Sequence, residues 1–219
     1  MKIIRIGHSC FKLISDEGKI VLTDPFDESV GIGRLNCEEA DIVTTSHYHG
    51  DHNFLEGVKK GYILVNEVGT TKIGGISIDG ISSYHDECEG KKRGKNVIFR
   101  FDIDGVRVCH MGDIGEPPSD DLVGKIGKID VLLLPVGGFY TVEPDIAREY
   151  VDAISSATVI PMHYKTENCR YDIKSVDAFL SVCADYPTKY EESDEISFCV
   201  EDFAAKSRTT ITILKAKHF

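Results

Sequence analysis

The sequence feature that most restricts how this chain can fold is a short run of potential metal ligands, SHYHGDH at positions 46–52. It follows an apolar, β-branched stretch (40–45), which predicts a buried strand that ends where the run begins. Imidazole and carboxylate are ligands that zinc accepts. A solvated polar loop with ordinary hydrogen bonds is the alternative, but such a density of histidine is rare without a metal. The run therefore predicts metal binding.

The spacing of the run allows its donors to serve two ions, because neighbouring side chains of a loop can face different sites. His47 and His49 could share one metal while Asp51 and His52 face another. Four residues do not complete two sites. The remaining ligands must come from elsewhere in a chain that has eight histidines.

Three further donors lie where predicted strands end. His85 follows the strand 76–83, and His163 lies just beyond the strand 158–160. Asp113 follows the strand 106–109, and a carboxylate there could bridge two cations. Each could singly be an ordinary polar residue, or a cap in the case of Asp113. Their joint position at the starts of loops favours a role as ligands.

Other polar residues beside strand ends are assigned behind the ligands or to the substrate pocket. These are His8, Asp24 and His110. A carboxylate such as Asp24 would orient a ligand histidine or a water through a hydrogen bond.

Hydrophobic periodicity predicts a first half rich in strands and a second half in which strands and helices alternate. The expected strands are 2–6, 10–15, 19–22, 40–45, 62–65, 71–73, 76–83, 97–102, 106–109, 131–134 and 158–160. The expected helices are 53–60, 118–125, 143–155 and 173–185. This order predicts an α/β fold in which two sheets face each other, helices lie outside and loops gather along one edge.

Length and composition set the broad class. A chain of 219 residues with 42% hydrophobic content fits one compact domain spanning residues 1–219. No secretory signal or membrane-length apolar run is visible, and the seven scattered cysteines lack a C-x-x-C pair, so we expect a cytoplasmic protein with reduced thiols. A net charge of −11 argues against nucleic acid as a partner but is compatible with a small anionic substrate.

The ordered motifs resemble the metallo-β-lactamase-fold hydrolase superfamily. The resemblance rests on TDP at 23–25, the H-x-H-x-D-H run, His85, Asp113 and His163, and covers about the first 165 residues. Finer segments resemble the subgroup related to the L-ascorbate-6-phosphate lactonases, namely GHSCF at 7–11, HMGD at 110–113, LPVGG at 134–138 and PMHY at 161–164.

This resemblance implies a four-layer αββα sandwich that holds two divalent metal ions. One ion would be held by His47, His49 and His85, the other by Asp51, His52 and His163, with Asp113 bridging both and Asp24 supporting the ligand loop. Zinc is the default, and Mn²⁺ or Fe²⁺ also suit such donors. The resemblance is also compatible with a homo-oligomer.

Such a site predicts a hydrolase that uses a metal-bound hydroxide on a small ester or lactone, which could carry a phosphate. Asp51 would orient the hydroxide as the catalytic residue, and His8, His110 or Tyr164 could donate a proton to the leaving group. Lys165 and Arg170 could bind an anionic group of the substrate. The cluster KKR at 91–93 could do the same, but exposed solubilising charge is the simpler interpretation.

Three other functions fit the same run. Phosphodiester hydrolysis is the nearest, and a non-catalytic metal-binding protein of the same fold is the second. A di-iron redox centre is the third, but there the resemblance requires a glutamate where this chain has His49.

Overall fold

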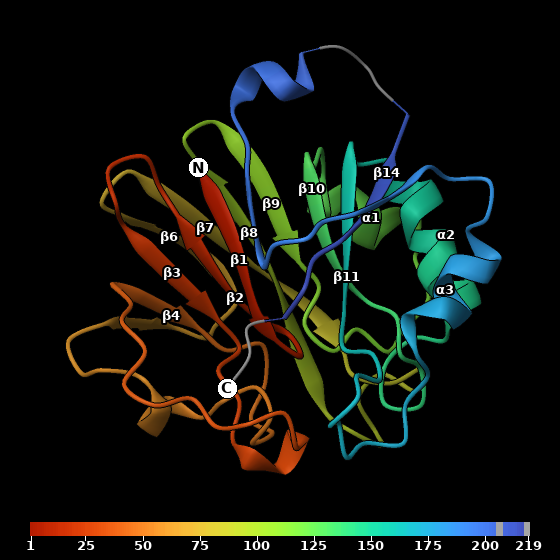
Figure 1. The fold of residues 1–219 in the computed structure, drawn as a ribbon, viewed down its shortest axis with the longest axis horizontal. Helices are drawn as coiled ribbons and strands as arrows, with labels where there is room; N and C mark the ends of the chain where they lie inside the picture. Colours follow the sequence, from red (N-terminus) through yellow and green to blue (C-terminus); the bar gives the residue numbers. More distant parts are fainter. Residues whose placement is uncertain (205–207, 217–219) are drawn as a thin grey trace.

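The computed structural model describes residues 1–204 and 208–216, and its framework is a pair of mixed β-sheets packed face to face (Figure 1). The six-stranded sheet has the order β13-β1-β2-β3-β4-β5 and the eight-stranded sheet the order β12-β14-β11-β10-β9-β8-β7-β6. The first sheet consists of β1 (Lys2–Gly7), β2 (Cys10–Ile14), β3 (Ile20–Thr23), β4 (Ile42–Thr44), β5 (Ile63–Val65) and β13 (Glu195–Ser197). The second consists of β6 (Gly69–Ile73), β7 (Ile76–Tyr84), β8 (Lys95–Ile103), β9 (Val106–His110), β10 (Val131–Pro135), β11 (Thr158–Met162), β12 (Thr188–Tyr190) and β14 (Thr210–Ile213).

The helices lie against one side of the eight-stranded sheet. They are α1 (Asp120–Ile126), α2 (Pro144–Ile154) and α3 (Val176–Val182), at the right of Figure 1. Proline is at the first position of α2, where a missing N–H costs nothing, and the helix buries Ala147, Tyr150 and Val151. The side chain of Ser119 accepts a hydrogen bond from Leu122 N and so caps α1. The helices are therefore amphipathic, and their apolar faces are buried against the sheet.

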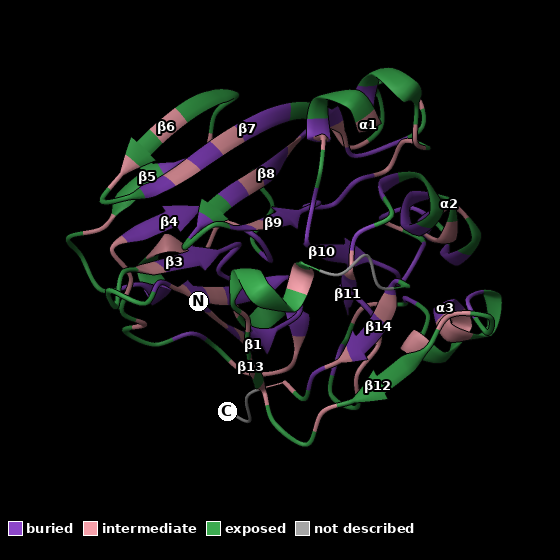
Figure 2. Ribbon diagram, turned by 90° about the horizontal axis from the view of Figure 1, so that it is seen from above, coloured by how far each residue is buried: buried purple, intermediate pink, exposed green. Residues whose placement is uncertain are grey.

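Three apolar layers separate the elements. The middle layer lies between the sheets and contains Phe11, Phe99 and Phe101, all fully buried. A second layer packs the helices on the eight-stranded sheet, so that in Figure 2 the helices show exposed outer and buried inner faces. A third layer, which includes Phe26 and Leu35, covers the other sheet with loops and the short 3₁₀ turns Glu28–Val30 and Leu55–Gly57. The predicted sandwich is thus confirmed, with an irregular fourth layer.

Most predicted strands are found within one or two residues of their expected ends. The predicted helix at 53–60 is wrong, because the structure has only the 3₁₀ turn Leu55–Gly57 there. The following residues instead extend beside Glu38, whose N–H donates to Gly57 O and whose carbonyl accepts from Lys59 N. The helix expected at 173–185 is shorter and spans Val176–Val182. The C-terminal strands β12, β13 and β14 were not predicted at all.

Strand direction brings three of the predicted ligands, His85, Asp113 and His163, to one edge of the eight-stranded sheet. β9, β10 and β11 are mutually parallel, and β7 runs in the same direction because it is separated from β9 by the antiparallel strand β8. The loops that follow these four strands therefore leave the sheet at the same edge. Within the described residues, no helix is long and apolar enough to cross a membrane.

Candidate metal centre

Two groups of potential metal ligands lie beside this edge, and a third, which consists of His47, His52 and Asp113, joins them. We call His47, His49 and His85 the outer group, and His8, Asp51, His52 and His163 the inner group. Within each group, one donor atom from every residue lies within 4.8 Å of those of the others. All members of the inner group are buried, whereas His49 of the outer group is exposed.

The carboxylate of Asp113 lies between the two groups. Its Oδ1 is 3.2 Å from His52 Nε2, and its Oδ2 is 3.3 Å from both His85 Nε2 and His163 Nε2. A third distance, from Oδ2 to His47 Nε2, is 3.9 Å. Asp113 therefore contacts donors of both groups, as the position of a bridging ligand requires.

The chemistry of these atoms fits cations. The Nε2 atoms of His8, His47, His52 and His163 and the Oδ1 atom of Asp113 are buried and have no hydrogen-bond partner among the described residues. A buried polar group left without a partner costs about 1–3 kcal/mol. Unpartnered atoms of this kind, gathered within 4.8 Å of one another in each group, suit the binding of a positive ion.

Asp24 orients the donor loop from behind. Its Oδ2 accepts a hydrogen bond from His52 Nδ1 (2.7 Å) and another from Ser46 Oγ (2.6 Å), and its Oδ1 accepts from Ser46 N (2.8 Å). Because the one hydroxyl proton of Ser46 goes to Asp24, Ser46 Oγ accepts from His47 Nδ1 at 3.0 Å. Both imidazoles therefore carry a proton on Nδ1 and turn Nε2 toward Asp113.

Asn96 holds the backbone of Asp113 in place from behind in a similar way. Its Oδ1 accepts from Asp113 N at 2.9 Å, while its amide group donates to Met111 O at 2.9 Å and to Ser83 Oγ at 2.8 Å. The turn also depends on Gly112, which has φ +56°, and a Cβ added there would lie 2.3 Å from Asn96 Oδ1. Sequence reasoning missed Asn96. A lone amide between Lys95 and the apolar residue Val97, at the start of a strand, was the available signal.

His8 and His110, which the sequence placed together in a supporting role, differ in position. His8 belongs to the inner group, and its Nε2 is 3.4 Å from Asp51 Oδ2. Both nitrogens of His110 instead serve the backbone: Nδ1 accepts from Gly112 N at 3.1 Å, so Nε2 carries the proton and donates to Ser9 O at 2.7 Å. His110 therefore shapes the loop behind Asp113 and has no free nitrogen for a substrate.

The candidates beyond His163 also lie away from the metal-ligand cluster. Tyr164 is buried in the core, with the guanidinium of Arg5 4.6 Å from its ring centroid. Lys165 donates to Tyr171 O at 2.5 Å, and Arg170 reaches Glu28 O at 3.4 Å. The geometry of these side chains favours a role in holding loops together.

A cavity of about 580 Å³ opens over both groups. Its lining residues are Tyr48, His49, Gly50, Asp51, His85, Arg93, Asp113, Tyr140 and Tyr171. Sequence reasoning did not single out the three tyrosines, because tyrosine is common in cores and nothing local marks these. Tyr171 donates or accepts a hydrogen bond with Ser29 Oγ at 3.0 Å, and burial raises the pKa of its hydroxyl to about 12. It therefore stays protonated at neutral pH.

Burial and neighbouring charges shift the pKa values of the titratable groups at the site in different directions. Burial, followed by the nearby His52, lowers the pKa of His47 to about 3, and burial, followed by His163, lowers that of His8 to about 4. Burial also opposes the charged form of His52, but the carboxylates of Asp113, Asp51 and Asp24 outweigh it and raise the pKa of His52 well above 6.5. For Asp113, burial is likewise outweighed by His163 and His52, and its pKa is far below its usual value. The site thus offers neutral imidazoles at His8 and His47 together with ionised carboxylates, the forms that bind cations, whereas a cation must displace a proton from His52.

With the site in view, comparison with known proteins places the chain among metal-dependent hydrolases of one superfamily. A β-lactamase superfamily domain matches residues 2–163. A relative named UPF0173 metal-dependent hydrolase, from Thermoplasma acidophilum, is 32% identical over 191 residues, covering 76% of this chain and 84% of the relative. Another of that name, from Methanoculleus marisnigri, is 33% identical over 189 residues, covering 76% and 82%.

Solved structures agree with this placement. A protein from Thermotoga maritima assigned as a Zn-dependent hydrolase of the metallo-β-lactamase superfamily is 34% identical, with a TM-score of 0.75 over 98% of this chain and 99% of its own. The chain therefore has the metallo-β-lactamase fold and belongs to the UPF0173 metal-dependent hydrolase family.

Proposed function

We propose that this protein is a dinuclear metal-dependent hydrolase that cleaves a small ester or lactone. The observation that carries the proposal is the pair of donor groups that share Asp113 on the floor of one cavity. His47, His49 and His85 would hold one ion, and Asp51, His52 and His163 the other. When bound, two divalent cations supply Lewis acidity, which activates water and polarises the oxygen of the scissile bond.

The chain's own residues supply orientation and proton handling. Asp51 lines the cavity, and the nearby His52 and His8 hold its pKa below the usual range despite its burial, so it stays ionised. An ionised carboxylate there can accept a hydrogen bond from the attacking water and fix its direction. His8 Nε2 lies 3.4 Å from Asp51 Oδ2, on the buried side of the same carboxylate.

The leaving group needs a proton, and the position of Tyr171 suits it as donor. Its hydroxyl is protonated at neutral pH and its side chain lines the cavity. Of the three donors considered from sequence, His110 faces the backbone, Tyr164 lies in the core, and His8 belongs to the inner group of potential ligands. Tyr171 therefore replaces them in the proposal.

The ester or lactone class is supported by the resemblance to the L-ascorbate-6-phosphate lactonase subgroup and by a cavity of about 580 Å³, which suits a small molecule. Zinc is supported by the assignment of the Thermotoga maritima relative as Zn-dependent. A di-iron redox centre is disfavoured, because His49 stands where the resemblance requires a glutamate.

Elemental analysis combined with a substrate screen tests the proposal. We expect about two metals per chain in protein purified without added metal, and hydrolysis of lactones or esters by the metal-loaded protein. Fewer than one metal per chain would overturn the dinuclear site. Activity confined to bis(p-nitrophenyl) phosphate would replace the lactonase by a phosphodiesterase, and a metal-replete protein inactive on the whole screen would indicate a binding protein.

A further inference from the structure

Arg93 lies at the end of a loop that is fixed directly beside the metal-ligand cluster. We call residues 86–94 the Asp86 loop. The buried carboxylate of Asp86 accepts hydrogen bonds from four backbone N–H groups of this loop, those of Cys88, Gly90, Lys92 and Arg93, at 2.7–2.9 Å. His85 N donates to Gly94 O at 3.0 Å and closes the loop at its base. Because Asp86 follows His85 directly, the loop is anchored at a predicted ligand.

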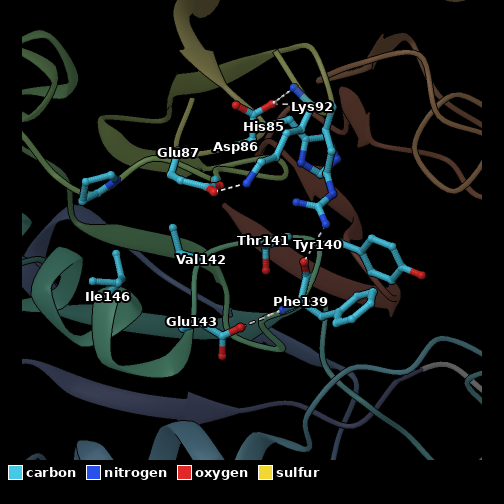
Figure 3. A pocket seen from close by; sticks show the side chains of 13 residues that line it. His85, Asp86, Glu87, Lys92, Phe139, Tyr140, Thr141, Val142, Glu143 and Ile146 are labelled. Atoms are coloured by element: carbon cyan, nitrogen blue, oxygen red, sulfur yellow. Dashed lines mark hydrogen bonds and ion pairs between the residues drawn. The ribbon is translucent and has the colours of Figure 1, made fainter. Parts of the chain in front are cut away.

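The three basic residues of this loop have different surroundings. Lys92 forms an ion pair with Glu87, and Figure 3 shows the two side chains directed at each other on one wall of a neighbouring cavity. Lys91 is exposed and lines none of the cavities described near the site. Only Arg93 reaches the cavity above the metal-ligand cluster. The interpretation of the cluster as solubilising charge thus fits Lys91 but not Arg93.

The guanidinium of Arg93 is held in place without being neutralised. Its Nη2 donates to Phe139 O at 2.9 Å, and its Cζ lies 5.6 Å from the ring centroid of Tyr140. No carboxylate of a described residue forms an ion pair with it. A guanidinium has five N–H donors in a planar fork, so donors remain for a ligand.

Arg93 is also the only lysine or arginine among the described residues that line this cavity. The other polar lining groups are tyrosine hydroxyls, imidazoles and the carboxylates of Asp51 and Asp113. The chain has a net charge of −11, so a half-buried cation without an ion-pair partner is an unusual group to find in this cavity. Such a cation attracts anionic groups and not neutral ones.

We propose that Arg93 binds an anionic oxygen group of the substrate, a carboxylate or phosphate, and so makes this enzyme selective for anionic esters or lactones. This inference rests on the proposed hydrolytic function. The reacting bond would lie over Asp113, and the charged group would lie toward the Asp86 loop. A charge-assisted hydrogen bond to such a group is stronger than a neutral one and is lost with a neutral substrate.

Steady-state kinetics on matched substrates tests this role. The pairs are p-nitrophenyl butyrate with p-nitrophenyl hydrogen succinate, and glucono-δ-lactone with its 6-phosphate. For Arg93→Ala we expect kcat/KM on the anionic members to fall about 10- to 100-fold, mainly through KM, since hydrogen bonds to charged groups contribute about 1.5–3 kcal/mol. The neutral members should change by less than about threefold, and which anionic pair responds separates carboxylate from phosphate recognition.

Two further variants separate recognition from loop support. Arg93→Gln keeps an N–H donor for Phe139 O but removes the charge, so it should behave like Arg93→Ala if the charge matters and like the wild type if only the loop contact matters. Lys91→Ala, which removes a neighbouring positive charge outside the cavity, is the matched control and should leave both members of each pair unchanged.

The possible failures are distinguishable. Equal losses on neutral and anionic substrates, or a wild-type-like Arg93→Gln, would overturn the role of Arg93 while the hydrolase function stands. A metal-loaded wild type that hydrolyses none of the four compounds would overturn the proposed function, and the role of Arg93 with it.

Discussion

The outer and inner groups differ in exposure, in charge and in what supports them. The outer group consists of three imidazoles, of which His49 is exposed. The inner group is buried throughout, includes the carboxylate of Asp51, and has Asp24 hydrogen-bonded behind His52. More negative charge and a fixed ligand orientation favour tight binding of a cation, whereas an exposed imidazole must be ordered when the ion binds. We therefore expect an ion in the inner group to be held more tightly and an ion in the outer group to exchange more readily.

Replacing the shared carboxylate should have the largest effect, because it removes the contact that unites the groups. Asp113→Asn is expected to lower the metal content of both groups and to reduce kcat/KM by more than about 100-fold, since losing a residue behind a ligand already costs about 10- to 100-fold. Elemental analysis and steady-state kinetics measure this. Asp120→Asn, an exposed carboxylate in the first turn of α1, is the control. Full occupancy of either group in Asp113→Asn would show that the groups are independent.

Removing one imidazole from each group tests the difference in affinity directly. His49→Ala and His163→Ala should each retain about one metal per chain, since each removes a ligand from only one group. The ion left in His49→Ala is in the inner group and should be released to a chelator more slowly than the ion left in His163→Ala. Release rates followed with a chromogenic chelator decide the matter. Equal rates, or faster release from His49→Ala, would contradict the order of affinities.

The hydrogen bond from His52 to Asp24 offers a smaller change at the inner group alone. Asp24→Asn should weaken metal binding there by about 10- to 100-fold, the usual effect of losing the partner that orients a ligand histidine. Competition with a chelator of known affinity gives the dissociation constant of the metal at each group. A comparable loss at the outer group would mean that Asp24 supports both groups equally, since it also contacts Ser46 beside His47.

The two groups should also respond differently to pH. Because its pKa is raised well above 6.5, His52 of the metal-free protein is protonated at neutral pH, and an ion must displace that proton. Affinity of the inner group should therefore rise with pH, by about tenfold per unit for one displaced proton, until the pKa of His52 is passed. His47 and His85, whose pKa values are lowered by burial, have no such proton to lose. Calorimetric titration in buffers of different ionisation enthalpy counts the protons released when metal binds. If no proton is released at the inner group, His52 is not protonated in the metal-free protein and the prediction is wrong.

Local pattern predicted much of the framework. Period-two alternation located the strands of the first half, and the 3.6-residue period located α1 and α2. The pattern failed at 53–60, where Gly57 and Lys59 hydrogen-bond to Glu38 instead of forming a helix. It also failed in the C-terminal strands, which are only three or four residues long and are held by neighbours distant in sequence. In both places tertiary contacts override local propensity.

The residues of the candidate site were likewise only partly predictable from the sequence. Residue types and their places after strands were enough to select residues that the structure brings together, because metal chemistry restricts which side chains can bind an ion. The roles of Asn96, Tyr171 and Arg93 could not be predicted, since each is an ordinary residue type that gains its role from the residues packed around it.

The sequence by itself determined that this chain gathers imidazoles and carboxylates at strand ends, and hence the class of chemistry. The tertiary structure decided that His8 joins the inner group, that His110 serves the backbone, and that one arginine of the basic cluster faces the cavity. The physical reason is that ligand identity depends on a side chain's own chemistry, whereas orientation depends on hydrogen bonds and packing between segments far apart in the chain.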